Sequence, residues 1–206
     1  MQQFEVLKEI YDKVFCDLNG YGVSFLEKEN SQDDYFKKDV IYGQTPFELL
    51  YALFYLNPLN SYLPKAKVFY DLGSGIGNNV IGAYLLHNFD KCVGVELLDS
   101  LYELSCKARN KMIDIDKNCS NKIKFIHDNI LNVDFSDADV IFFSCPTKND
   151  DLRYKMEEKF AKDLKSGTII LSLIHKFKDE KNFKIVDARM VNSAWGQAPM
   201  IFYEKI

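Results

Sequence analysis

The chain has 206 residues, 47% hydrophobic and 14% aromatic, which is enough apolar material for one buried core but short for two. A net charge of −4 and a sequence pI near 5.5 give the whole molecule no electrostatic attraction to nucleic acid. Five scattered cysteines predict reduced thiols rather than disulfides or a metal site, and without a signal peptide or an apolar run of ~20 residues we expect a soluble cytoplasmic or nuclear protein with no membrane contact.

The N-terminal part predicts two helices and a connector. Apolar residues recur at helical spacing over residues 3–18, which indicates an amphipathic helix. Residues 27–39 are polar and charged and predict a loop. A second helix is expected from Thr45 as N-cap, with Pro46 at the first helical position, as far as residues 57–58. We expect residues 1–65 to form a helical extension and lid over the rest of the chain.

Short apolar runs and helical patterns then alternate. Runs rich in β-branched and aromatic residues, as expected for buried strands, lie at 67–71, 92–96, 123–127, 139–143 and 168–173. Helical patterns follow the first, second and fourth of these runs, at 80–86, 100–112 and 149–164. Such alternation is typical of an α/β fold with a doubly wound parallel sheet.

The tail breaks this alternation. Two further strands are predicted at residues 183–191 and 199–204, with only a short loop between them. Strands joined in this way form an antiparallel hairpin. We therefore expect an α/β domain over residues 66–206, with a doubly wound, seven-stranded, mostly parallel sheet that ends in an antiparallel hairpin.

The stretch DLGSGIGN, residues 71–78, joins the first predicted strand to the next helix. Gly73 and Gly75 let the backbone turn and let a ligand lie against it. A dinucleotide turn requires another glycine where Asn78 stands, and the carboxylate of Asp71 would repel phosphate at the carboxyl edge of the sheet. A ligand with cationic groups fits better, and S-adenosylmethionine carries a sulfonium and an ammonium group.

Acids also end the second and third predicted strands. Glu96 stands ~20 residues after the glycines, where a carboxylate binds both hydroxyls of a ribose in dinucleotide and S-adenosylmethionine sites alike. Asp128, followed by Asn129, is placed to accept a hydrogen bond from the exocyclic amine of adenine. The alternative is that each acid is only a solvated strand end, and Asp128 is the most open to it.

Two motifs together resemble the Dot-one-like histone-lysine methyltransferase family. They are YGQTPF, residues 42–47, and DLGSGIGN, and the resemblance runs from about Tyr42 to the C-terminus. It implies a class I, Rossmann-like methyltransferase with S-adenosylmethionine as cofactor and no metal. It also implies the residues that contact this cofactor: Tyr42, Thr45, Asp71, Gly73, Gly75, Asn78, Glu96, Asp128, Asn129 and Ser144. By resemblance, Tyr42 and Thr45 close over its methionine end.

The chain departs from the family at two places. Gln44 stands where the first motif has glutamate, and Ser144-Cys145-Pro146 follows the fourth strand where nucleosomal members have Asn-Asn-Phe. The tail around Trp195 is similar to bacterial and protist members without an assigned substrate. Ser144 could still hold an amine or a water, and Trp195 is either a packing plug or a wall of the acceptor channel.

The resemblance implies a protein substrate with an acceptor lysine, for which a histone is one candidate. The lysine must arrive neutral, and an apolar channel, for which Tyr42, Phe143 and Trp195 are candidates, would lower its pKa. Together with Ser144, Tyr42 and Trp195 are the catalytic candidates. No strong nucleic-acid binding is expected, because the lysines of residues 148–184 are interleaved with acids. The sequence leaves the oligomeric state open.

Two alternatives remain at this point. The acceptor could be a small molecule or a nucleic-acid base, since one fold serves many acceptors. The altered Ser144 stretch is also compatible with a protein that binds S-adenosylmethionine without transferring its methyl group. Loss of S-adenosylmethionine binding would contradict all of these hypotheses together.

Overall fold

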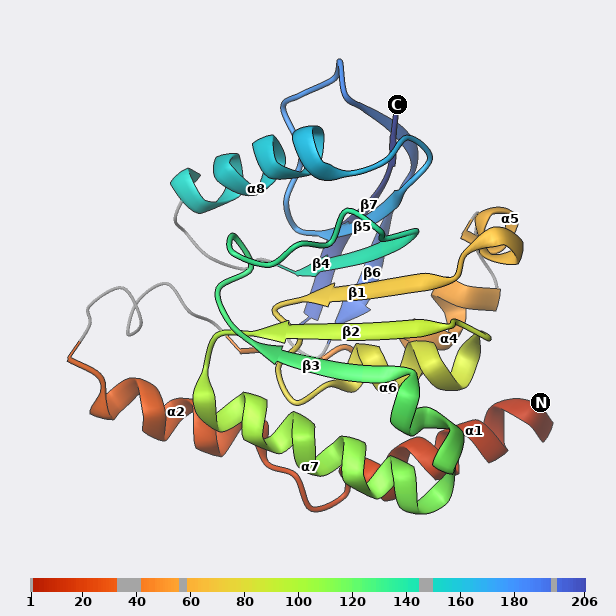
Figure 1. The fold of residues 1–206 in the computed structure, drawn as a ribbon, viewed down its shortest axis with the longest axis vertical. Coiled ribbons are helices and arrows are strands. Elements are labelled where there is room, and N and C mark those ends of the chain that lie inside the picture. Colours follow the sequence, from red (N-terminus) through yellow and green to blue (C-terminus); the bar gives the residue numbers. More distant parts are fainter. Residues whose placement is uncertain (1, 33–41, 56–58, 145–149, 194–195) are drawn as a thin grey trace.

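The computed structural model describes residues 2–32, 42–55, 59–144, 150–193 and 196–206. A single seven-stranded sheet in the order β3-β2-β1-β4-β5-β7-β6 runs through it (Figure 1). The strands are β1 Val68–Leu72, β2 Lys91–Glu96, β3 Ile123–His127, β4 Val140–Ser144, β5 Ile169–Leu173, β6 Phe183–Ser193 and β7 Gly196–Lys205. The first five are parallel, and β7 pairs antiparallel with both β5 and β6. The predicted fold class is thereby confirmed.

Helices cover both faces of this sheet. They are α1 Gln2–Phe15, α2 Gly20–Asn30, α4 Phe47–Tyr55, α5 Leu59–Tyr62, α6 Asn78–Leu86, α7 Asp99–Ile115 and α8 Asp150–Asp163, with 3-10 turns at Leu63–Lys65 and Lys117–Asn121. Alternate strand residues face opposite layers: Phe69 packs in the core under α4, α6 and α7, whereas Tyr70 packs in the core under α8. In Figure 1 the strands lie between α8 and the group of α1, α2 and α7.

The N-terminal segment differs from its prediction. The first helix ends at Phe15, and α2 extends to Asn30, so the predicted loop is wrong for residues 27–30. Helix α4 begins at Phe47 rather than Pro46: the Pro46 carbonyl accepts the first helical hydrogen bonds, and Thr45 lies one residue before it. The predicted end of this helix at 57–58 lies outside the described residues.

The N-terminal helices share the core of the sheet. Tyr11 and Val14 of α1 are buried in the same cluster as α4 and α6. The division into an extension of residues 1–65 and a domain of residues 66–206 stays a prediction. Within the described ranges, none of the helices has the length and apolar character that crossing a membrane requires.

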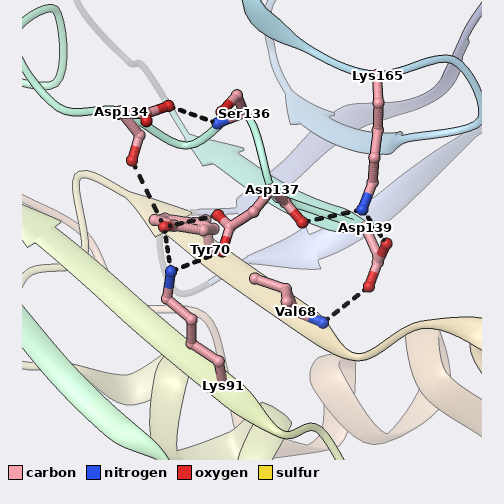
Figure 2. A network of polar contacts seen from close by, with 8 residues as sticks. All are labelled: Val68, Tyr70, Lys91, Asp134, Ser136, Asp137, Asp139 and Lys165. Atoms are coloured by element: carbon pink, nitrogen blue, oxygen red, sulfur yellow. Dashed lines mark hydrogen bonds and ion pairs between the residues drawn. The ribbon is translucent and has the colours of Figure 1, made fainter.

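A polar network fastens the amino ends of the strands (Figure 2). The Asp139 carboxylate accepts hydrogen bonds from the backbone N–H groups of Lys67 and Val68 at 2.6 and 2.9 Å, and pairs with Lys165 at 2.6 Å. Although partial burial opposes it, these contacts hold the pKa of Asp139 below its ordinary value. Beside it, Lys91 bridges Tyr70 and Asp137. These contacts give the polar groups at this edge a structural role.

Candidate active site

A glycine-rich turn leads from β1 into α6 at the carboxyl edge. Gly73, Gly75 and Gly77 have φ values of +86°, +55° and +90°, which side chains rarely adopt. The N–H groups of Gly73 and Ser74 both donate to the carbonyl of Val95 at 2.9 Å, so the turn is fastened to β2. A Cβ on Gly73 would lie 3.5 Å from the Ser144 carbonyl of β4. The turn therefore lies between the carboxyl ends of β2 and β4 and is close to both.

Asp71 is the most unusual residue of this turn. Its side chain is fully buried, and among the described residues neither carboxylate oxygen has a hydrogen-bond partner of good geometry. Burial raises the pKa of Asp71 well above its ordinary value; the nearby Asn79 amide opposes this shift and the charge of Glu96 adds to it. Ser74 Oγ and Asn79 Oδ1 are also buried without partners in this part of the chain. Buried polar atoms in such a state can be satisfied by a bound ligand or by ordered water.

Glu96, the last residue of β2, is buried but well bonded. One carboxylate oxygen accepts from the N–H of Gly75 at 2.7 Å, and the other from the N–H groups of Leu97 and Leu98, both at 2.8 Å. Burial raises the pKa of Glu96, and these three bonds oppose the rise. A carboxylate has about four acceptor positions. Glu96 is thus held in a fixed orientation and retains capacity for a hydroxyl donor.

Asp128 and Asn129 follow β3 and mainly stabilise their own turn. One oxygen of Asp128 accepts from the Asn129 N–H at 2.6 Å and from the Asn132 amide at 2.9 Å, while the Asn129 side chain accepts from the Leu131 N–H. The N–H of Asp128 donates to the Glu96 carbonyl at 3.1 Å. The structure therefore places this turn beside Glu96, and the predicted contact of Asp128 with adenine stays a prediction.

The YGQTPF stretch meets the glycine turn across more than thirty positions of sequence. The Tyr42 ring lies so close to Gly75 that a Cβ there would fall 2.6 Å from its Cε2 atom. Gln44, which replaces the glutamate expected by resemblance, donates to Tyr42 Oη at 2.8 Å. Burial raises the pKa of Tyr42, so this phenol is neutral. Thr45 is buried nearby. A cavity of about 450 Å³ adjoins Thr45 and lies between the start of α4, α1 and the turn.

Asn78 has a partner that the sequence did not reveal. Its amide donates to Tyr11 Oη of α1 at 2.8 Å, and both side chains are buried. Asn78 thus fastens α1 to the start of α6, directly behind the turn. Tyr11 was predicted only as part of an amphipathic helix, and no local signal marks a contact across 67 positions.

Of the residues predicted to contact the methyl acceptor, the structure describes Tyr42, Phe143 and Ser144. Ser144 ends β4 and is half-buried beside Gly73. Residues 145–149 and 194–195 lie outside the described residues, and with them Cys145, Pro146 and Trp195. Phe143 is not a channel wall: its ring is buried under α8 and packs against Phe160 with centroids 5.3 Å apart. Its alternation along β4 turns it toward the core while Ser144 stays at the edge.

Comparisons with known proteins identify the family. The model of the family described as histone methylation protein DOT1 matches residues 21–195. A protein from Saccharolobus islandicus named protein-lysine N-methyltransferase is 34% identical over 113 residues, and the match covers 54% of this chain and 63% of that protein.

Solved structures share the fold. An RNA methyltransferase from Salinibacter ruber, in complex with S-adenosyl-L-homocysteine, has a TM-score of 0.56 at 21% identity, covering 79% of this chain and 93% of the other. A putative RNA methyltransferase from Pyrococcus horikoshii has a TM-score of 0.56 at 16% identity, with 91% and 96% covered.

Proposed function

The chain belongs to the DOT1 family of histone methylation proteins, whose cofactor is S-adenosylmethionine, and we propose that it transfers a methyl group to lysine side chains of a protein. The observation that carries this proposal is the buried, unpartnered carboxylate of Asp71 beside the glycine turn. The relative named protein-lysine N-methyltransferase supports the class of acceptor. The description of the family makes histones one candidate substrate, and other proteins with accessible lysines fit the same chemistry.

The residues present fit the cofactor. Asp71 offers an anionic acceptor for a cationic group, Glu96 is oriented for ribose hydroxyls, and the backbone of Gly73 and Gly75 leaves room for a ligand against the turn. Asn78, which bonds to Tyr11, and the buried Thr45 are further candidates for this cradle. When bound, S-adenosylmethionine supplies an electrophilic methyl group on a sulfonium.

Such a transfer is an in-line displacement, so the chain contributes alignment and exclusion of water. Tyr42 lies over Gly75 as a neutral phenol; it can donate or accept a hydrogen bond but is not a base. The acceptor lysine, with an ordinary pKa of ~10.4, would lose its proton to solvent on entering apolar surroundings. We propose that the Ser144 hydroxyl, at the end of β4, orients the neutral amine.

The test has two parts. Calorimetric titration measures binding of S-adenosylmethionine to the purified chain, and a radiolabelled methyl assay then compares histones, whole lysate protein and RNA as acceptors. We expect binding, and label recovered as methyl-lysine after protein hydrolysis. Label confined to RNA or to small molecules would replace the proposed acceptor, and binding without any transfer would indicate a silent binding protein. The Asp71→Asn variant serves as the control for the site.

A further inference from the structure

Helix α2 is joined to the cofactor half of the site by an unusual cap. The Glu27 carboxylate accepts hydrogen bonds from the N–H groups of Asp99 and Ser100 at 3.1 and 2.9 Å. These groups belong to the first turn of α7, whose own N-cap residue, Leu98, supplies no side-chain acceptor. The cap thus comes from a residue 72 positions away. In Figure 1, α2 lies along the start of α7, on the side toward which β1 and β2 point.

This cap continues the contacts of the ribose acid. Glu96 accepts from the N–H groups of Leu97 and Leu98, and Glu27 accepts from the next two. The N–H groups of residues 97–100 therefore donate in turn to Glu96, which accepts two, and to Glu27 of α2, which accepts the other two. The charge of Glu27 also contributes to the raised pKa of Glu96. A displacement of α2 would consequently be felt at the end of β2.

The other end of α2 fixes Tyr42. A Cβ on Gly20 would lie 2.4 Å from Tyr42 Oη, and a Cβ on Gly75 would lie 2.6 Å from the opposite edge of the same ring. The ring of Tyr21 packs edge-on against Tyr42 with centroids 5.0 Å apart. Tyr42 is thus held between two glycines, one on α2 and one on the cofactor turn. Neither position has space for a methyl group while Tyr42 stays in place.

A small apolar cluster completes the connection. Its buried members are Ile76 of the glycine turn and Leu98, Leu101 and Leu104 of α7. Val23 of α2 and Tyr42 pack against them. One side of α2 therefore touches the turn, Tyr42 and α7 at once.

We propose that α2 is the element that positions Tyr42 over the cofactor, with Gly20 and Glu27 as positioning residues. The inference rests on the proposed cofactor site at the glycine turn. Gly20 sets how closely α2 approaches the ring, and Glu27 sets where α2 lies along α7. Together they determine how tightly the methionine end is covered, and so the affinity for the cofactor.

The decisive variant is Gly20→Ala. Alanine is the better helix former, which offsets packing that the Tyr42 ring loses, so the midpoint of thermal unfolding should change little. The added methyl group must nevertheless displace Tyr42, and we expect the Kd for S-adenosylhomocysteine to rise about 5–10-fold by loss of its aromatic packing. A purely structural role for α2 would not separate affinity from stability in this way. Leu26→Ala, at an exposed position of the same helix, is the matched control and should leave Kd unchanged.

Two further measurements make the test decisive. Glu27→Ala should also weaken binding, and in a Tyr42→Ala background Gly20→Ala should have no further effect on Kd, because the ring it displaces is gone. Unchanged Kd in Gly20→Ala and Glu27→Ala, with normal binding by the wild type, would overturn this inference alone. Failure of the wild type to bind S-adenosylhomocysteine would instead overturn the proposed cofactor site beneath it.

Discussion

Replacing Asp71 by asparagine separates the stability of the protein from its function. In the ligand-free protein the Asp71 carboxylate is fully buried and without a hydrogen-bond partner among the described residues. Asparagine has the same shape and carries no charge. The variant should therefore fold as well as the wild type, and any loss of binding should report on the carboxylate itself.

We expect Asp71→Asn to change stability and cofactor binding in opposite directions. Replacing a buried carboxyl group whose charged form is disfavoured by burial should leave the free energy of unfolding unchanged or raise it by up to about 2 kcal/mol. A hydrogen bond to a charged group contributes about 1.5–3 kcal/mol. Its loss should raise the Kd for S-adenosylmethionine about 10–150-fold. The Asp71→Asn variant should thus be at least as stable as the wild type and clearly weaker in binding.

The pH dependence of stability and of cofactor affinity provides a second test of Asp71. In the folded, ligand-free protein the pKa of Asp71 lies well above its ordinary value of 3.8. The free energy of unfolding should therefore fall as the pH rises from 3.8 to the raised pKa, and this group should not change it at higher pH. A cationic ligand favours the carboxylate, so binding releases a proton and affinity rises with pH over the same window. Calorimetric titrations at several pH values, in two buffers of different ionisation enthalpy, measure both quantities. Equal Kd and equal pH slope in Asp71→Asn would refute the assignment.

Four further outcomes are expected. Gly73→Arg should abolish cofactor binding, measured by calorimetry, because φ is +86° and the Ser144 carbonyl is close. Ser144→Ala should leave Kd nearly unchanged but alter kcat in the methyl assay, whereas a proportional change in Kd would contradict its acceptor-side role. Asp139→Asn should lower the free energy of urea unfolding by about 2 kcal/mol, through weaker bonds to two N–H groups and one lysine. Burial lowers the pKa of His175 from 6.5 to about 4. Its contribution to the free energy of unfolding is therefore complete above pH 6.5 and is lost as the pH falls toward 4, a loss on the order of 3 kcal/mol. A His175→Gln variant should lack this dependence on pH.

Local patterns were sufficient to predict the sheet. The parallel strands β1, β2, β4 and β5 are buried on both faces, so each reads as a largely apolar run bounded by turns, whereas the edge strand β3 is only partly buried. The glycine turn was equally readable, because φ values near +90° restrict the residue type at single positions. Strand ends shifted by one to three residues, as for β1, which ends at Leu72 rather than Asp71, and β7, which begins at Gly196 rather than at 199.

Helix α2 could not be predicted in the same way. Its sequence, GYGVSFLEKEN, contains two glycines and a charged end, which read as a helix breaker and a loop. Its stability comes from distant partners: Glu27 on α7 and Gly20 against Tyr42. The bond from Asn78 to Tyr11 is of the same kind. Tertiary contacts overrode local propensity at each of these places.

The distribution of charge explains why the N-terminal helices surround the turn. Asp71, Glu96 and Glu27 form an acidic series in which the charge of Glu96 raises the pKa of Asp71, and that of Glu27 raises the pKa of Glu96. Glu27 and Glu96 are compensated by backbone N–H groups at the start of α7, whereas Asp71 has no such compensation. Asp71 is buried away from water, which strengthens its attraction for a cationic ligand. We therefore propose that selectivity for a sulfonium cofactor arises from this one buried carboxylate.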